Sequence, residues 1–143
     1  MLIQPYLFYN GTCDEAIAFY REALGAKELM KMRFKEAPPD PARPMPPEFA
    51  EKIMHATLQI GDAEIMLSDG GCMTKEDKFR GFGVSLTAPD IATAERYFNA
   101  LANGGQVTMP FQKTFWSPGF GMLADRFGVP WMISAPPLES PAA

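Results

Sequence analysis

Residues 54–68 read Met-His-Ala-Thr-Leu-Gln-Ile-Gly-Asp-Ala-Glu-Ile-Met-Leu-Ser, two alternating runs that meet at Gly61-Asp62. Alternation around a Gly-Asp pair is typical of a β-hairpin with a tight turn. Pairing Ile60 with Ala63 across this turn sets the register of the two strands. The predicted core face then carries Met54, Ala56, Leu58, Ile60, Ile65 and Leu67. The opposite face, which is either ordinary solvent-exposed sheet or the wall of a wet cleft, carries His55, Thr57, Gln59, Glu64, Met66 and Ser68.

Apolar residues at helical spacing predict two helices elsewhere in the chain. The first begins after Thr12, whose distance in sequence from Glu15 is that of a capping box, and it ends at Gly25. The second begins at Asp90 and ends at the Asn-Gly-Gly of residues 103–105.

One strand-like segment precedes each helix and three follow it. These segments are 3–9, 27–33, 53–60 and 64–68 around the first helix, and 81–87, 106–109, 114–115 with 122–124, and 129–134 around the second. The element order is therefore βαβββ written twice, although few residues match between the halves. We predict an α+β fold in a single domain over 1–135, with units at about 1–70 and 80–135, and a disordered tail over 136–143.

The overall composition excludes several classes of protein. The net charge is −4, from 13 basic and 17 acidic residues scattered along the chain. Because the basic residues form no stripe, nucleic acid is not an expected partner. No apolar stretch approaches the roughly 20 residues that span a bilayer. The simplest interpretation is a soluble cytoplasmic protein. Its two cysteines, Cys13 and Cys72, are expected to stay reduced, because they form no metal-binding or disulfide pattern.

Residues 36–51 contain six prolines, which lack the backbone donor that a central strand needs. We call this segment the Pro-rich arm and expect it to leave the sheet. It is a plain surface loop, a flap over a site, or an arm onto a second subunit.

Several motifs together indicate a family. They are Pro-Tyr-Leu-Phe-Tyr-Asn-Gly at 5–11, Ala-Ile-Ala-Phe-Tyr at 16–20, Leu-Gly-Ala at 24–26, His-Ala at 55–56, Ile-Met-Leu-Ser-Asp at 65–69, Thr-Phe-Trp-Ser-Pro-Gly-Phe-Gly at 114–121 and Asp-Arg-Phe-Gly-Val-Pro-Trp-Met-Ile at 125–133. Over almost its whole length the chain resembles the PhnB-like branch of the vicinal oxygen chelate superfamily, which includes glyoxalase I, bleomycin-resistance proteins and extradiol dioxygenases.

The resemblance implies a glyoxalase-like fold, in which two incurved mixed sheets line a small-molecule cleft and the helices cover their convex sides. It favours the cleft interpretation of the polar hairpin face. The implied cleft residues are His55, Thr57, Gln59, Met66, Ser68, Trp116 and Met132. It also places Tyr9 near the cleft, whereas alternation assigns Trp131 and Ile133 to the helix side.

Metal enzymes of the superfamily hold a divalent ion with one residue from each of four strands. The resemblance carries these positions to Pro5 with its neighbour Gln4, to Phe82 or Gly83, to Met66 and to Met132. A thioether binds hard divalent ions poorly, and proline has no side-chain donor. We therefore predict that the usual metal site is missing and that the chain uses no cofactor.

Three functions are open from the sequence. The leading one is metal-free binding of a small molecule, with no identified reaction. The alternative is a metal-dependent lyase or isomerase of the glyoxalase type with shifted ligands such as His55 and Glu64. The third is a structural dimer module with a vestigial cleft. A hydrolase built on His55 and Ser68 is excluded, because neither an acidic third member nor a strand-to-helix turn accompanies the pair. His55 itself is either a ligand-orienting group or a structural histidine hydrogen-bonded across the hairpin.

The last expectation concerns assembly. Superfamily members commonly dimerise through their βαβββ units, and open sheets leave strand edges that must be covered. We predict a symmetric homodimer in which the Pro-rich arm packs against the partner through Met45 and Phe49.

Overall fold

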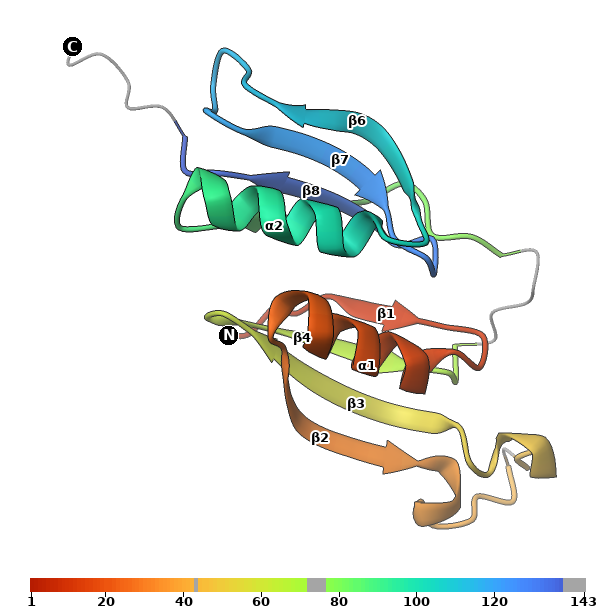
Figure 1. Ribbon diagram of the computed structural model, residues 1–143. Helices are drawn as coiled ribbons and strands as arrows, with labels where there is room; N and C mark the ends of the chain where they lie inside the picture. Colours follow the sequence, from red (N-terminus) through yellow and green to blue (C-terminus); the bar gives the residue numbers. More distant parts are fainter. Residues whose placement is uncertain (43, 72–76, 138–143) are drawn as a thin grey trace. The chain divides into compact units, whose positions relative to one another are not determined.

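The computed structural model describes residues 1–42, 44–71 and 77–137 (Figure 1). The chain divides into two compact units, one ending at Asp77 and the other beginning at Lys78. No helix among the described residues is long and apolar enough to cross a membrane. The tail predicted to be disordered lies mostly outside the described residues, as does Cys72.

The N-terminal unit is a four-stranded mixed sheet with one helix over a face (Figure 1). Its elements are β1 (Tyr6–Phe8), α1 (Cys13–Leu24), β2 (Lys27–Arg33), β3 (Ile53–Ile60) and β4 (Ala63–Ser68), with 3₁₀ turns at Phe34–Glu36 and Pro47–Phe49. The strand order is β1-β4-β3-β2, in which β1 runs parallel to β4 and the other pairs are antiparallel.

The C-terminal unit repeats this topology. It consists of β5 (Val84–Thr87), α2 (Ile91–Ala102), β6 (Gln106–Gln112), β7 (Phe120–Ala124) and β8 (Pro130–Ser134). The strand order is β5-β8-β7-β6, again with one parallel pair, β5 with β8. The prediction of an α+β fold with two βαβββ units is confirmed.

One predicted strand segment was wrong. Residues 114–115 lie outside the strands, since β7 begins only at Phe120. The Thr114 N–H donates to the Ser117 carbonyl at 2.9 Å, and the Ser117 N–H donates to Thr114 Oγ1 at 3.1 Å. These reciprocal bonds close a turn in place of an extended strand.

The hairpin has the predicted register, with Ile60 opposite Ala63, Gln59 opposite Glu64 and Thr57 opposite Met66. Its core face is buried at Ala56, Leu58, Ile65 and Leu67.

Met54 departs from the predicted core face of the hairpin. Met32 of β2 pairs with His55 and Arg33 with Ile53, so Met54 is the extra residue of a β-bulge. Ile53 is fully buried instead, and Met54 lines a pocket.

The capping box predicted for α1 was also wrong, since Thr12 makes no side-chain cap bond. The buried carboxylate of Asp69, which follows β4, holds this helix start instead. Its Oδ1 accepts from the N–H groups of Gly11 at 2.9 Å and Cys13 at 3.1 Å, and its Oδ2 accepts from the N–H of Ile53 at 3.0 Å. The α2 helix begins as predicted, with the Thr93 N–H donating to Asp90 at 2.7 Å.

We predict that Asp69→Asn lowers the free energy of unfolding by about 2 kcal/mol, because an amide NH₂ faces donors that the carboxylate accepts from. Urea denaturation measures the change. Asp62→Asn in the exposed hairpin turn removes the same charge and should change stability little. Equal stability of the two variants would show that the Asp69 carboxylate does not hold the unit together.

Candidate functional site

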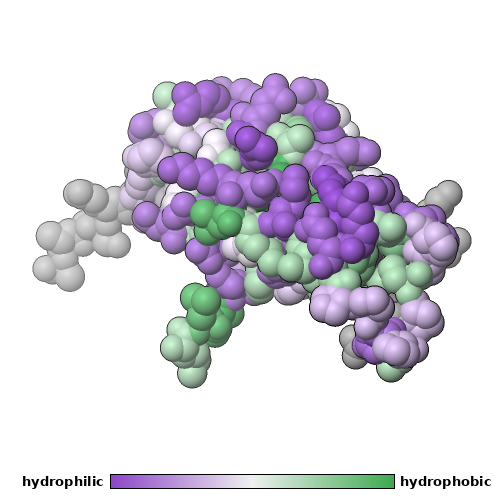
Figure 2. Space-filling model, turned by 90° about the horizontal axis from the view of Figure 1, so that it is seen from below, coloured by the Kyte–Doolittle hydropathy of each residue, from purple (hydrophilic) through white to green (hydrophobic). Residues whose placement is uncertain are grey.

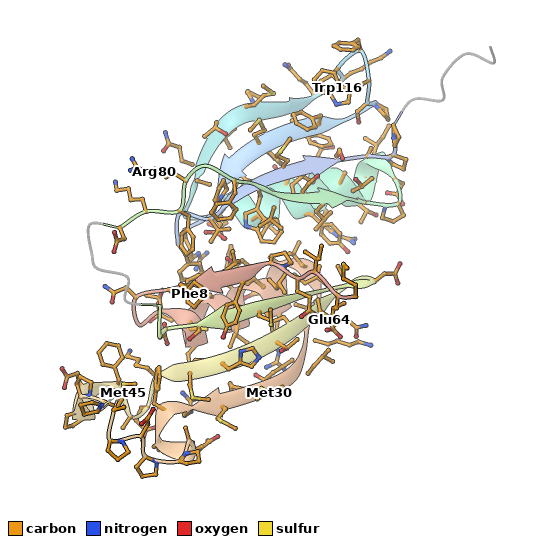
Figure 3. The ribbon with its side chains drawn as sticks, turned by 180° about the vertical axis from the view of Figure 1, so that it is seen from behind. Phe8, Met30, Met45, Glu64, Arg80 and Trp116 are labelled. Atoms are coloured by element: carbon orange, nitrogen blue, oxygen red, sulfur yellow. The ribbon has the colours of Figure 1, made fainter. Side chains whose placement is uncertain are left out.

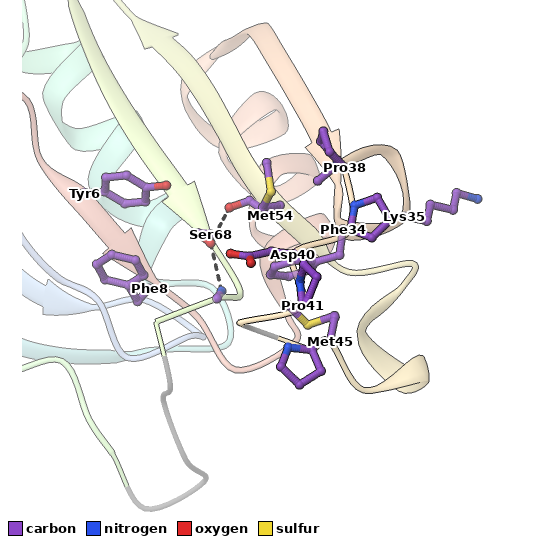
Figure 4. A pocket seen from close by; sticks show the side chains of 14 residues that line it. Tyr6, Phe8, Phe34, Lys35, Pro38, Asp40, Pro41, Met45, Met54 and Ser68 are labelled. Carbon is purple, nitrogen blue, oxygen red and sulfur yellow. Dashed lines mark hydrogen bonds between the residues drawn. The ribbon is translucent and has the colours of Figure 1, made fainter.

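An open pocket of about 830 Å³ lies in the N-terminal unit, between the polar sheet face and the Pro-rich arm (Figure 4). Apolar rings make up much of its wall, with a few polar groups among them, as in many small-molecule sites. The lining residues are Tyr6, Phe8, Phe34, Lys35, Ala37, Pro38, Pro39, Asp40, Pro41, Pro44, Met45, Met54, Ser68 and Gly70.

Tyr6 and Phe8 form an aromatic pair on one side of this pocket (Figure 4). They alternate with the buried Leu7 on β1, so both rings project from the same face of the sheet. The rings stack with centroids 4.7 Å apart and an angle of 7° between their planes. Each residue is 37% exposed, which leaves ring surface for a ligand to contact.

His55 lies beside Tyr6 and does not line the pocket itself. The Tyr6 hydroxyl is 2.7 Å from His55 Nδ1, and His55 Nε2 is 3.3 Å from Thr57 Oγ1. A tyrosine hydroxyl is protonated at neutral pH, and burial raises the pKa of Tyr6 further, so this hydroxyl can donate to Nδ1. The Thr57 hydroxyl can donate to Nε2 or accept from it. His55 therefore positions Tyr6, which favours the interpretation of His55 as a structural histidine. Its hydrogen-bond partner comes from β1 and not from across the hairpin.

Ser68 is buried at the pocket floor, between the Tyr6–Phe8 pair and the arm (Figure 4). Its hydroxyl donates to the Met54 carbonyl and accepts from the Gly70 N–H at 2.9 Å. Both bonds fix the backbone next to the pocket. Since the His55 ring nitrogens bond to Tyr6 and Thr57, no His–Ser dyad forms.

The described side chains at the positions expected for metal ligands offer a poor set of donors for a divalent ion. The Gln4 amide donates to Glu64 Oε2 at 2.7 Å, and Met66 stands opposite Tyr6 at the position where the metal enzymes carry a glutamate. Glu64 pairs with Gln59, which is four residues from His55 on β3, or roughly 13 Å along the strand. Figure 3 shows Phe8, opposite Ser68, and Glu64 toward opposite ends of the sheet. Among the described residues, no three His, Cys, Asp or Glu side chains lie close enough to share an ion.

The remaining predicted site residues divide between the units. Gln59 lies on the same face as Thr57 and Met66, whereas Trp116 and Met132 belong to the C-terminal unit. The Trp116 ring is 5.3 Å from that of Phe120, and Met132 pairs with Ser85 and Met122 in the sheet. A cleft that joins all seven residues stays a prediction.

Of the two aromatic assignments made from the sequence, one is confirmed. Trp131 and Ile133 are buried in the core. Tyr9, expected near the cleft, is buried too, and its hydroxyl is 2.9 Å from that of Tyr20 on α1. The expectation failed because Tyr9 shares the helix-facing side of the chain with Leu7.

The Pro-rich arm is tied to its own unit at both ends. The Phe34 and Phe49 rings meet edge to face at 6.2 Å, and the Lys35 N–H donates to the Ala50 carbonyl at 3.0 Å. Arg33 binds both carboxylate oxygens of Asp14, at 2.6 and 3.1 Å, and donates to the Glu51 carbonyl. Residues between these anchors line the pocket, which agrees with the flap interpretation.

Tyr6, Phe8 and Phe34 are pocket residues that the sequence analysis missed, whereas a flap over a site was one of its three interpretations of the arm. The signal for the first two was the alternation in 5–9. In a βαβββ unit with β1 parallel to β4, it places Tyr6 with Met66 and Phe8 with Ser68. No comparable signal decides among the three interpretations of the arm, because its path depends on contacts far apart in the sequence.

The Asp14–Arg33 pair that anchors the arm predicts a dependence of stability on pH. The hydrogen bond from Arg33 lowers the pKa of Asp14. A carboxyl whose pKa is lower in the folded state adds stability above its unfolded pKa of about 4, and this stability is lost as pH falls through the folded value. Because the pair is partly exposed, we expect a contribution of less than about 1 kcal/mol.

Urea denaturation of the unchanged protein and of Asp14→Asn should therefore differ more at pH 6 than at pH 3. Asp62→Asn is the control for the loss of one negative charge. A stability difference that is the same at both pH values would contradict the assignment of this pair.

A model of the Glyoxalase/Bleomycin resistance protein/Dioxygenase superfamily matches residues 2–133. Protein YjdN of Escherichia coli (strain K12) is 39% identical over 142 residues, covering 94% of this chain and 95% of that protein. Protein PA1353 from Pseudomonas aeruginosa is 40% identical with a TM-score of 0.83, covering 95% of this chain and 98% of that one. A Bacillus cereus protein described as a putative 3-demethylubiquinone-9 3-methyltransferase, PhnB protein, shares the fold, with a TM-score of 0.76 at 23% identity and coverage of 94% and 99%. The resemblance stated from the sequence is confirmed.

Proposed function

Because the chain belongs to the glyoxalase/bleomycin resistance protein/dioxygenase superfamily, we propose that its N-terminal unit binds a small organic molecule without a metal ion. The ligand lies between the Tyr6–Phe8 pair and the Pro-rich arm. The observation that carries this proposal is the exposed, stacked aromatic pair that faces a pocket of about 830 Å³. Aromatic walls with few polar groups supply most of the contact area in such sites.

The donor chemistry supports binding without a metal. Met66 offers a soft thioether in place of a carboxylate, and Glu64 is held by Gln4 at the far end of the hairpin. Both ring nitrogens of His55 face protein hydroxyl groups. A metal at His55 would first have to displace Tyr6 or Thr57.

The same geometry favours holding a ligand over transforming it. Among the described residues, no carboxylate bonds to His55 to stabilise an imidazolium during proton transfer. Burial strongly raises the pKa of the Cys13 thiol, so this group stays protonated and is not a nucleophile at neutral pH. We therefore propose sequestration or transport of the ligand as the role of this pocket.

The test is to identify what the purified protein carries. Mass spectrometry of extracts should find a small molecule with the unchanged protein, and much less of it with Tyr6→Leu or Phe8→Leu. Leu29→Ala, which removes an exposed apolar side chain of β2 outside the pocket, is the matched control. A molecule retained equally by all variants would place the ligand elsewhere.

Elemental analysis of the same samples tests the metal-dependent alternative. We expect no stoichiometric divalent ion and no change of melting temperature with a chelator, since only a ligand bound to the folded state shifts it. A melting temperature lowered by the chelator, and no longer lowered in His55→Ala, would favour the alternative.

We also propose that the chain forms the predicted homodimer. The strand order leaves β1 and β2 at the edges of the N-terminal sheet. Met1, Leu2 and Ile3 are exposed, and Figure 2 shows apolar groups exposed among hydrophilic ones on the face it presents. Light scattering should give twice the mass of 15.8 kDa. A monomer would contradict the proposal, and an unchanged dimer after deletion of residues 37–48 would remove the arm from the interface.

A further inference from the structure

Two charged residues line the pocket in the part of the chain that the structure describes, and they are Lys35 and Asp40. The Lys35 ammonium is 2.7 Å from Glu51 Oε1 and extends away from the pocket (Figure 4). Asp40 bonds only to the Ala42 N–H, at 2.9 Å through Oδ1, among the described residues. Figure 4 shows its carboxylate turned toward Ser68, so the pocket presents to its interior a negative group that no described cation neutralises.

The hydrogen-bonding groups of the pocket have the same bias toward acceptors. Ser68 already donates to Met54, and the Tyr6 hydroxyl already bonds to His55. Four lining residues are prolines, which have no backbone donor: Pro38, Pro39, Pro41 and Pro44. An anionic ligand would find little to replace its lost hydration here, and its charge would remain uncompensated.

The aromatic groups act in the same direction. The faces of aromatic rings carry negative potential and attract cations, more strongly when the site is partly desolvated. Tyr6 and Phe8 stand across from the arm segment that carries Asp40 (Figure 4). A positive group at Asp40 therefore lets the rest of the same molecule lie against the two rings.

From these observations we propose that the ligand is an organic cation, with an apolar or planar body on the Tyr6–Phe8 pair and its ammonium or guanidinium group at Asp40. This inference rests on the proposed function, because it names the ligand class of the same pocket. The aromatic contact supplies most of the affinity, and Asp40, which is exposed, supplies selectivity for charge.

Three probes that share an indole ring test the charge directly: tryptamine is a cation, tryptophol is neutral and indole-3-acetate is an anion. Calorimetry or NMR titration on the full chain gives each dissociation constant. We expect tryptamine to bind about two- to fivefold more tightly than tryptophol, as an exposed ion pair allows, and indole-3-acetate to bind most weakly. The preference for tryptamine should shrink as salt is added.

Asp40→Asn keeps an oxygen that accepts from Ala42, so the arm should retain its fold. In this variant tryptamine should bind no better than tryptophol does, while tryptophol binding stays the same. Asp62→Asn, with the same change in net charge outside the pocket, should leave all three affinities unaltered.

The results separate the two proposals. If tryptophol or indole-3-acetate binds as tightly as tryptamine, and Tyr6→Leu weakens them all, the pocket is a binding site but the preference for cations is overturned. If tryptamine binds equally well to Asp40→Asn, its ammonium group interacts with a residue other than Asp40 and the inference is wrong. If no probe binds, the inference is also overturned, and the proposed function is decided by the extracted ligand alone.

Discussion

The N-terminal unit depends on one buried carboxylate. Asp69 follows β4, and its oxygens accept from the start of α1 at Gly11 and Cys13 and from Ile53 at the start of β3. Asp69 is 58 residues from Gly11, 56 from Cys13 and 16 from Ile53 along the chain. A carboxylate removed from water needs several donors to offset its lost hydration, and the backbone supplies three here. The start of the helix and the hairpin are therefore fixed relative to each other at a single point.

The pocket is built next to that point. Ser68 precedes Asp69 and bonds to Met54 and Gly70, so the backbone at the pocket floor is held from both sides. Phe8 pairs with Ser68 in the parallel ladder, and Tyr6 pairs with Met66 two residues earlier. The bond between Tyr6 and His55 then joins β1 to β3 across the intervening β4, which restricts the tyrosine ring before any ligand arrives. A ring held in this way loses little conformational entropy on binding.

Local patterns in the sequence predicted the features that depend on neighbouring residues. The register of the hairpin follows from the Gly61-Asp62 turn, and the start of α2 from Asp90. The failures involve distant residues. Asp69, far from Thr12 in the sequence, caps the start of α1 in place of the expected Thr12 side chain. The bulge at Met54 arises from the pairing of β3 with β2. The arm could be predicted to leave the sheet, because prolines exclude a strand. Its position beside Tyr6 and Phe8 depends on contacts such as that of Phe34 with Phe49, which no periodicity reveals.

In the proposed function, the arm is the part of the pocket that selects among ligands. Its prolines order the segment in advance, because each fixes one backbone angle, and they withhold donors from the pocket. Phe34 and Phe49 anchor it, while Asp40 between these anchors provides a formal charge that faces the interior. An exposed carboxylate contributes little affinity by itself, but it repels anions. A neutral ligand that covers it removes some of its hydration and supplies no opposite charge in return. The proposal assigns to the stacked rings of Tyr6 and Phe8 the contact with a flat ligand body, which many molecules could make, and therefore assigns the choice among ligands to the arm.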